Sequence, residues 1–184
     1  MVKILLFTLA IIAAGLGYLA FYVGYFKPVT LSETDAGPFS ALAADHRGAY
    51  HKMAPVISEI EKWAQGHGLK CRLTFGQYFD DPDSVEEARL RSRGGCFLDN
   101  GETPPSAPWP EGLALIEIPR RHFVTAAFEG SPGIGPLRVY PALGNYVKEK
   151  KLQSTGEGVI EVYEVKGTRE MKTIYYFPAG QRYR

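Results

Sequence analysis

"VYPALGNYVKEKKLQ", residues 139–153, repeats the pattern of "VISEIEKWAQGHGLK", residues 56–70. In both stretches the apolar residues recur at intervals of three and four, which places them on one face of a helix. Each stretch therefore predicts an amphipathic helix. The apolar residues are Val56, Ile57, Ile60, Trp63 and Ala64 in the first stretch and Val139, Tyr140, Leu143, Tyr146 and Val147 in the second.

The segments that flank these two helices repeat as well. "FSALAAD" (39–45) is matched by "FVTAAFE" (123–129), and "GQYFD" (76–80) is matched by "IEVYE" (160–164). The offset between matched segments stays at 83 or 84 positions. A constant offset indicates an internal duplication rather than a coincidence of composition.

Each copy is predicted to run strand, helix, strand, strand. The fold class is therefore α+β, with two helices and a largely antiparallel, pseudo-twofold sheet. We place the domain at residues 38–184, with copy one at 38–100, a Pro-rich connector at 101–112 and copy two at 113–178. The last hairpin is expected to turn at "KGTRE", residues 166–170. Equivalent surfaces of the two copies should meet in a cleft.

The N-terminus has a different composition from the rest of the chain. No charged residue occurs from Ile4 to Phe26, a run that as a helix spans ~35 Å and so exceeds a bilayer core of ~30 Å. We interpret residues 1–27 as a single-pass transmembrane helix with its lipid contacts at 4–26; a cleaved signal peptide is the alternative. Residues 28–37 are expected to be a polar tether. The basic residues Lys3 and Lys27, with the N-terminal amine, favour the domain on the extracytoplasmic side.

The chain contains two cysteines, Cys71 and Cys96, nearly symmetric about the turn of the copy-one hairpin. Two readings stay open. Either both are buried free thiols, or cross-strand proximity allows a disulfide, which requires an oxidising compartment.

Composition and motifs argue against several functional classes. The net charge is +1, so no overall field attracts nucleic acid. The four histidines show no metal-ligand spacing, and we expect no metal and no cofactor. Aromatic residues make up 12% of the chain, which fits a ligand groove or a large sheet surface.

Glu161 is the candidate functional residue, in the middle of the predicted strand "GVIEVYEV" (158–165). Strand alternation places Glu161 and Tyr163 on one face. The repeat makes Gln77 the partner of Glu161, with Phe75 and Phe79 beside it. A shared cleft floor with an acid, an amide and aromatic rings follows from this alignment. A solvent-facing Glu161 remains the alternative.

The chemistry of such a floor depends on burial of the carboxylate. A buried carboxylate favours its protonated form unless a cation or a hydrogen-bond donor meets it. Tyr163, Tyr175 and Tyr176 supply hydroxyl donors in this sequence, and their rings could hold a cation.

The stretches "RVYPALGNYVKEKKLQ", "VIEVYE" and "IYYFP", with "GQYFDDPDSV" in copy one, resemble the GyrI-like, effector-binding domain superfamily. With the apolar N-terminus, the chain is most similar to the membrane-anchored testis-expressed protein 264 family. The resemblance implies a central groove for lipophilic, often cationic compounds, with Glu161 as its acid and Tyr176 and Tyr163 in its wall. Animal members act as endoplasmic-reticulum autophagy receptors through a long tail; this chain stops at "FPAGQRYR", so we do not expect that role here.

Three functional hypotheses result. The first is a membrane-anchored domain that binds a small lipophilic or cationic molecule. The second is a hydrolase of electrophilic small molecules, similar to superfamily members that hydrolyse cyclopropane-containing toxins, with Glu161 as general base. The third is a membrane-tethered adaptor that binds another protein.

Overall fold

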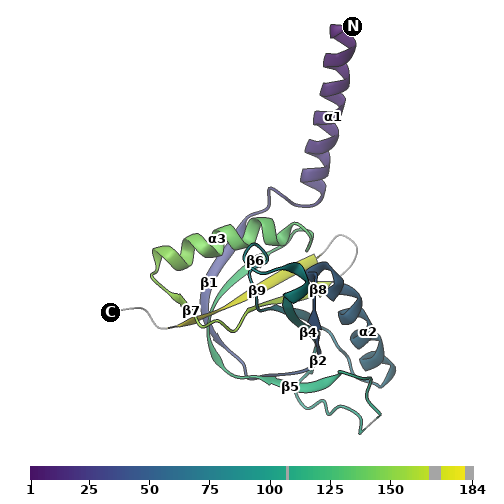
Figure 1. Cartoon of the computed structure of the whole chain (residues 1–184), viewed down its shortest axis with the longest axis vertical. Helices are drawn as coiled ribbons and strands as arrows, with labels where there is room; N and C mark the ends of the chain where they lie inside the picture. Colours follow the sequence, from purple (N-terminus) through teal and green to yellow (C-terminus); the bar gives the residue numbers. More distant parts are fainter. Residues whose placement is uncertain (107, 166–170, 181–184) are drawn as a thin grey trace.

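The computed structural model describes residues 1–106, 108–165 and 171–180. The expected turn at 166–170 and the last four residues lie outside this part of the chain. The described residues form three α-helices and one antiparallel sheet (Figure 1). The helices are α1 (Val2–Tyr22), α2 (Met53–Gly66) and α3 (Gly135–Glu149).

The nine described strands form a single sheet in the order β1-β6-β9-β8-β3-β4-β2-β5, and the short β7 pairs with β9. All pairs are antiparallel. The strands are β1 (Val29–Ala36), β2 (Phe39–Arg47), β3 (Thr74–Tyr78), β4 (Arg91–Phe97), β5 (Ala114–Ile118), β6 (Arg121–Phe128), β7 (Gln153–Ser154), β8 (Val159–Val165) and β9 (Met171–Gly180).

The strand order confirms the predicted α+β class and its pseudo-twofold arrangement. Copy one supplies β2, α2, β3 and β4, and copy two supplies β6, α3, β8 and β9. β3 and β8 pair at the centre, so the strands on either side mirror one another. The two copies are therefore joined by backbone hydrogen bonds in one continuous sheet.

The segment 28–37, which we expected to be a tether, is a strand of this sheet. β1 pairs with β6 along its whole length, from Val29 opposite Phe128 to Ala36 opposite Arg121. Alternation explains the difference, because Val29 and Leu31 point inward onto the core under α3 while the polar residues between them point outward. β1 precedes copy one and β5 begins copy two, yet each pairs with the other copy, β1 with β6 and β5 with β2.

Both domain helices cover the same face of the sheet. α2 contacts β2, β3 and β4, whereas α3 contacts β1, β6 and β9. The predicted apolar stripes are buried in part: Ile57, Ile60 and Ala64 in α2 and Val139 and Leu143 in α3 are buried. The other predicted members are half-buried, except Tyr140, which is 36% exposed. The helices thus lie over opposite halves of the sheet, and β8 lies between the strands that α2 contacts and those that α3 contacts.

The opposite face of the sheet is packed with aromatic side chains. Phe39 of β2 and Tyr176 of β9 have ring centroids 6.1 Å apart, although three strands separate β2 from β9. This contact is possible because the sheet curls strongly (Figure 1). We call this the concave face. Phe75, Phe97, Phe123, Ile160 and Val162 pack with them there.

Cys71 and Cys96 form a disulfide, with Cα atoms 5.4 Å apart. The bridged alternative is therefore the one that the structure adopts. The bridge links the segment before β3 to β4 and belongs to the core under α2, with Leu42, Ile60 and Leu69.

Helix α1 projects away from the sheet (Figure 1), and none of its residues is buried. By length and composition it can cross a membrane, a property that a signal sequence shares.

We predict that deleting residues 1–28 yields a soluble, folded domain, because α1 contributes nothing to the core. Deleting residues 1–36 additionally removes β1 and should lower the melting temperature by on the order of 10 °C, since ~3 kcal/mol of apolar burial is lost. Thermal unfolding followed by circular dichroism compares the two. Equal melting temperatures would show that β1 is dispensable.

His122 on β6 fastens β1 to the sheet by electrostatics. Its Nδ1 lies 3.0 Å from Asp35 Oδ1, and its Nε2 lies 3.2 Å from Glu33 Oε2. The hydroxyl of Tyr146 on α3 also donates to Glu33. The hydrogen bond to Asp35, and less strongly that to Glu33, raises the pKa of His122, because protonation lets both ring nitrogens donate.

A raised pKa in the fold means that His122 stabilises the protein below its unfolded pKa of about 6.5 and loses this contribution as pH rises through the folded value. We expect the advantage of the wild-type domain over His122→Gln to shrink between pH 6 and pH 9. Because these groups are partly solvated, the change should be at most about 1 kcal/mol. Melting temperatures of both proteins at the two pH values test this. An advantage that grows with pH would contradict it.

Candidate functional site

Glu161 lies at the centre of the sheet, on the face that the helices cover. It is 4% exposed. Its neighbours across the strands are Gly76 on β3 and Tyr175 on β9, and residues paired in an antiparallel ladder share a face. The strand-centre position buries the carboxylate, so the solvent-facing alternative for Glu161 is wrong.

Four tyrosines surround the carboxylate. Tyr140 of α3 donates its hydroxyl to Glu161 Oε1 at 2.9 Å, and Tyr163 of β8 donates to Oε2 at 3.1 Å. The hydroxyl of Tyr78 on β3 lies 3.1 Å from that of Tyr163. The Tyr175 hydroxyl is buried and makes no hydrogen bond to any residue that the structure describes. We call these four residues and Glu161 the tyrosine cluster.

Two glycines leave the space that the tyrosine rings occupy. A Cβ on Gly76 would lie 2.7 Å from the Tyr78 hydroxyl, and a Cβ on Gly135, at the start of α3, would collide with the Tyr175 hydroxyl. The absence of a side chain at these two positions therefore lets Tyr78 and Tyr175 lie close to the backbone.

The outer side of Tyr78 is held by Tyr50, which precedes α2. The two rings meet edge to face with centroids 4.8 Å apart. The Tyr50 hydroxyl donates to the Asp80 carbonyl at 2.7 Å and accepts from the Asp80 amide at 3.0 Å. Both copies thus contribute to the tyrosine cluster, copy one through Tyr78 and its support.

Burial raises the pKa of Glu161 to about 7, and the hydrogen bonds from Tyr140 and Tyr163 limit the rise. Burial, and then the nearby Glu161 carboxylate, raises the pKa of Tyr78 to about 12. The same two causes raise the pKa values of Tyr140, Tyr163 and Tyr175. At neutral pH all four phenols are therefore protonated donors, and Glu161 is balanced between its acid and its carboxylate.

This arrangement suits two kinds of chemistry. A carboxylate in an apolar, aromatic setting favours a bound cation, which supplies the missing counter-charge. A carboxyl group with a pKa near 7 can also accept a proton from water. Among the described residues, no group of three or more His, Cys, Asp and Glu side chains could hold a metal ion.

The structure brings together Glu161 and Tyr163 of the six residues expected to form the site, and separates the other four from them. Phe75 pairs with Val162, Gln77 with Ile160, and Tyr176 with Ile160. These residues belong to the concave face. Phe75 and Tyr176 are part of its aromatic core, whereas Gln77 and Phe79 line a separate cavity of about 330 Å³.

The expected pairing of Gln77 with Glu161 on one floor is wrong, and the cause is one position of alignment. The matched segments "GQYFD" and "IEVYE" make Gln77 the repeat equivalent of Glu161. In the β3–β8 ladder, however, the residue opposite Glu161 is Gly76, and Gln77 lies opposite Ile160. Side chains alternate between the faces of a strand, so a shift of one residue moves Gln77 to the other face. Its amide donates to the Glu157 carbonyl instead, at 2.7 Å.

Tyr78, Tyr140 and Tyr175 are the members of the tyrosine cluster that are not among the six expected site residues. The sequence points to Tyr175 only as a possible hydroxyl donor. Tyr140 was assigned to the apolar stripe of its helix, where it neighbours Val139. A tyrosine at such a position carries a hydroxyl that needs a hydrogen-bond partner when it is buried. That requirement is the feature of the sequence that could have indicated a polar group near Tyr140. Tyr78 lies in "GQYFD" next to Gln77 and was lost through the same shift.

Comparisons with known proteins agree with this fold. No family model matches the chain. Human testis-expressed protein 264 is 34% identical over 85 residues, which cover 41% of this chain and 27% of the human protein. The chain thus spans about a quarter of the length of this curated relative.

Three solved structures share the fold. The C-terminal domain of EcmrR is 14% identical, covering 83% of this chain and 98% of that domain, with a TM-score of 0.60. SAV2435 bound to tetraphenylphosphonium is 9% identical, covering 82% and 94%, with a TM-score of 0.55. A hydrolase encoded by lin2189 from Listeria innocua is 11% identical, covering 82% and 92%, with a TM-score of 0.54. At these identities the likeness establishes the fold alone. That fold is consistent with a GyrI-like fold.

The raised pKa of Glu161 makes stability depend on pH. Because its folded pKa of about 7 exceeds the unfolded value of 4.5, the wild-type domain should lose stability relative to Glu161→Gln as pH rises from about 4.5 to 7. The expected difference is about 3 kcal/mol. Chemical denaturation of both proteins at pH 5 and pH 8 measures it. Parallel pH profiles of stability for wild type and Glu161→Gln would contradict burial of the carboxyl group.

Tyr140→Phe should raise the pKa of Glu161 further, because it removes a hydrogen bond that favours the carboxylate. Carboxyl NMR titration detects this change.

Proposed function

We propose that this protein is a membrane-anchored domain that binds a lipophilic cation at the tyrosine cluster. The observation that carries the proposal is the Glu161 carboxyl, buried among four tyrosines with no cationic side chain among its hydrogen-bond partners in the described part of the chain. A cation with an apolar periphery would restore the charge balance and fill an aromatic site.

Access to Glu161 leads through Tyr140. Its side chain is 36% exposed although its hydroxyl reaches the buried carboxylate. Its ring also meets Tyr175 edge to face, at 5.9 Å between centroids. A ligand would displace the Tyr140 hydroxyl from Glu161 Oε1, so that the carboxylate faces the cation. The likeness to SAV2435, whose structure holds tetraphenylphosphonium, supports this class of ligand.

The location proposed for the domain is the extracytoplasmic side of a membrane, with α1 as a single-pass anchor. Helix α1 is long and apolar enough to span a bilayer. The Cys71–Cys96 disulfide supports the oxidising side, because disulfides persist outside reducing compartments.

Hydrolysis is the second candidate function. The pKa of Glu161, about 7, suits a general base that works at neutral pH. The likeness to the hydrolase from Listeria innocua is compatible with this activity. The two functions differ in one respect: a hydrolase consumes its ligand, whereas a binding domain releases it unchanged.

Isothermal titration of the domain lacking residues 1–28 with tetraphenylphosphonium tests the binding function. We expect Glu161→Gln to weaken binding by about 1–3 kcal/mol, the scale of a charge-assisted contact. Wild-type binding should strengthen as pH rises through about 7, since the carboxylate form of Glu161 increases. The uncharged triphenylphosphine oxide should bind with no such pH dependence.

Gln77→Ala is the matched control, because Gln77 lies on the concave face. If Gln77→Ala weakens binding while Glu161→Gln does not, the ligand occupies the 330 Å³ cavity and the proposed site is wrong.

To test hydrolysis, electrophilic esters and strained-ring compounds are incubated with the wild type and with Glu161→Gln. Turnover that falls by several decades in Glu161→Gln, with ligand binding retained, would establish the enzyme.

A further inference from the structure

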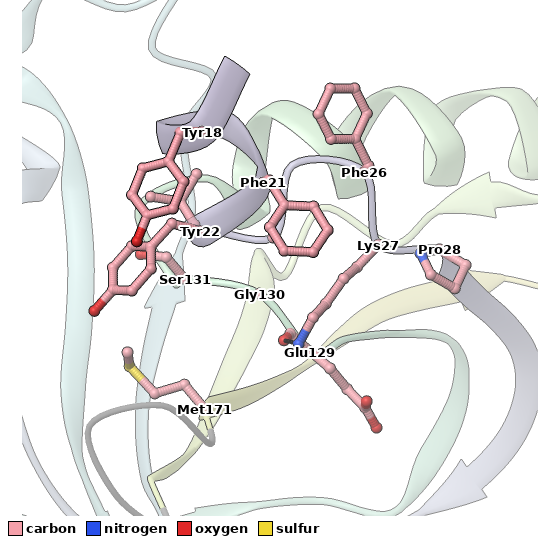
Figure 2. A pocket seen from close by; sticks show the side chains of 12 residues that line it. Tyr18, Phe21, Tyr22, Phe26, Lys27, Pro28, Glu129, Gly130, Ser131 and Met171 are labelled. Atoms are coloured by element: carbon pink, nitrogen blue, oxygen red, sulfur yellow. Dashed lines mark hydrogen bonds between the residues drawn. The ribbon is translucent and has the colours of Figure 1, made fainter. Parts of the chain in front are cut away.

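The junction between α1 and the domain contains a second site, separate from the tyrosine cluster. A cavity of about 700 Å³ opens there between the end of α1, the segment that follows it, and the loop from β6 to α3. Figure 2 shows the aromatic side chains that surround it, with Lys27 extending toward Glu129 and Met171 below Tyr22. The described lining residues are Tyr18, Phe21, Tyr22, Val23, Gly24, Phe26, Lys27, Pro28, Glu129, Gly130, Ser131 and Met171.

We propose that this junction cavity binds one anionic phospholipid of the surrounding leaflet. The proposal rests on the membrane anchoring proposed above, and it is independent of what the tyrosine cluster binds. It adds a specific lipid-binding site to a segment otherwise explained only as an anchor.

The first argument is the apolar surface at the junction. The side chains of Tyr18, Phe21, Tyr22 and Phe26 are between 61% and 75% exposed. Soluble proteins rarely expose such a group of rings together. The rings lie at the end of α1, where a membrane span passes from hydrocarbon to headgroups and where aromatic residues concentrate. Acyl chains and glycerol of a lipid are therefore the natural partners of these rings.

The second argument is the charge beside the rings. Lys27 donates from Nζ to the Glu129 carbonyl at 2.6 Å, which uses one of the three donors of its ammonium group. A second cation, Arg138 of α3, lies outside the lining, over the ring of Tyr25 at 5.1 Å. The Tyr25 ring in turn meets Phe26, which lines the cavity, at 5.5 Å between centroids. The Arg138 Nε is buried and makes no hydrogen bond within the described residues. Two cations beside an aromatic surface favour a phosphate with a net negative charge.

The third argument is that the junction has a defined geometry. The Ser131 amide donates to the Val23 carbonyl at 2.9 Å, and the Lys27 bond ties the same loop a second time. Gly24 and Gly130 pack so closely that a Cβ on Gly24 would lie 2.9 Å from the Gly130 Cα. The cavity is thus built between two held segments, which is what selective binding of one lipid requires.

Native mass spectrometry of the full-length protein tests the proposal. The protein is reconstituted in nanodiscs of equal parts phosphatidylcholine and phosphatidylglycerol and then released. We expect one retained phosphatidylglycerol per chain. Lys27→Met should lower its retention about tenfold, the scale of one charge-assisted contact. Met171→Trp should narrow the cavity at one wall and lower the retention of phosphatidylglycerol. Lys3→Met, at the opposite end of α1, is the matched control and should retain the lipid.

The proposal is overturned if the wild type retains no lipid, if phosphatidylcholine is retained as readily as phosphatidylglycerol, or if Lys3→Met reduces retention as much as Lys27→Met. Tetraphenylphosphonium binding by the domain lacking residues 1–28 is measured in parallel. Because that domain lacks the junction, loss of lipid retention with intact cation binding isolates a failure of this inference. Loss of cation binding with intact lipid retention isolates a failure of the proposed function.

Discussion

The pairing of β3 with β8 is the interaction on which the rest of this structure depends. It is the seam between two copies of one unit, and it turns two four-stranded halves into a continuous sheet. It also decides which residues lie under the helices and which enter the concave face. This register places Glu161 opposite Gly76, whose lack of a side chain leaves room for the Tyr78 ring beside the carboxylate.

The repeat made the fold class predictable, because periodicity and duplication are properties of whole segments and tolerate small errors. The helices around Ile57 and Val139 were predicted from their spacing, and both are buried on the expected side. The candidate site depends on single positions and tolerates no such error. An alignment offset of one residue was enough to exchange Gly76 for Gln77 and to move an expected partner through the sheet. Neither Tyr78 nor Tyr140 could be assigned to Glu161 without the tertiary packing that brings β3 and α3 to β8.

The tyrosine cluster combines two opposing electrostatic effects. Burial disfavours the Glu161 carboxylate, while two phenolic hydroxyls favour it, and the balance leaves its pKa at about 7. A cationic side chain in the same place would have fixed the carboxylate permanently as an ion pair. Phenols support the charge without neutralising it, so the protonation of Glu161 stays responsive to pH. On the concave face, by contrast, the tyrosine Tyr176 packs against the apolar core.

The exchange of edge strands between the copies has a consequence for how the chain is made. β1 lies directly after α1, yet its ladder partner, β6, begins more than eighty residues later. During synthesis from the N-terminus, α1 and the whole of the first copy are complete before β6 exists. Until then β1 has an unpaired edge, and the first copy lacks its outer strand β5. Closure of the sheet is therefore a late, long-range event, and a chain interrupted within the connector leaves the first half of the domain without either of its edge pairings.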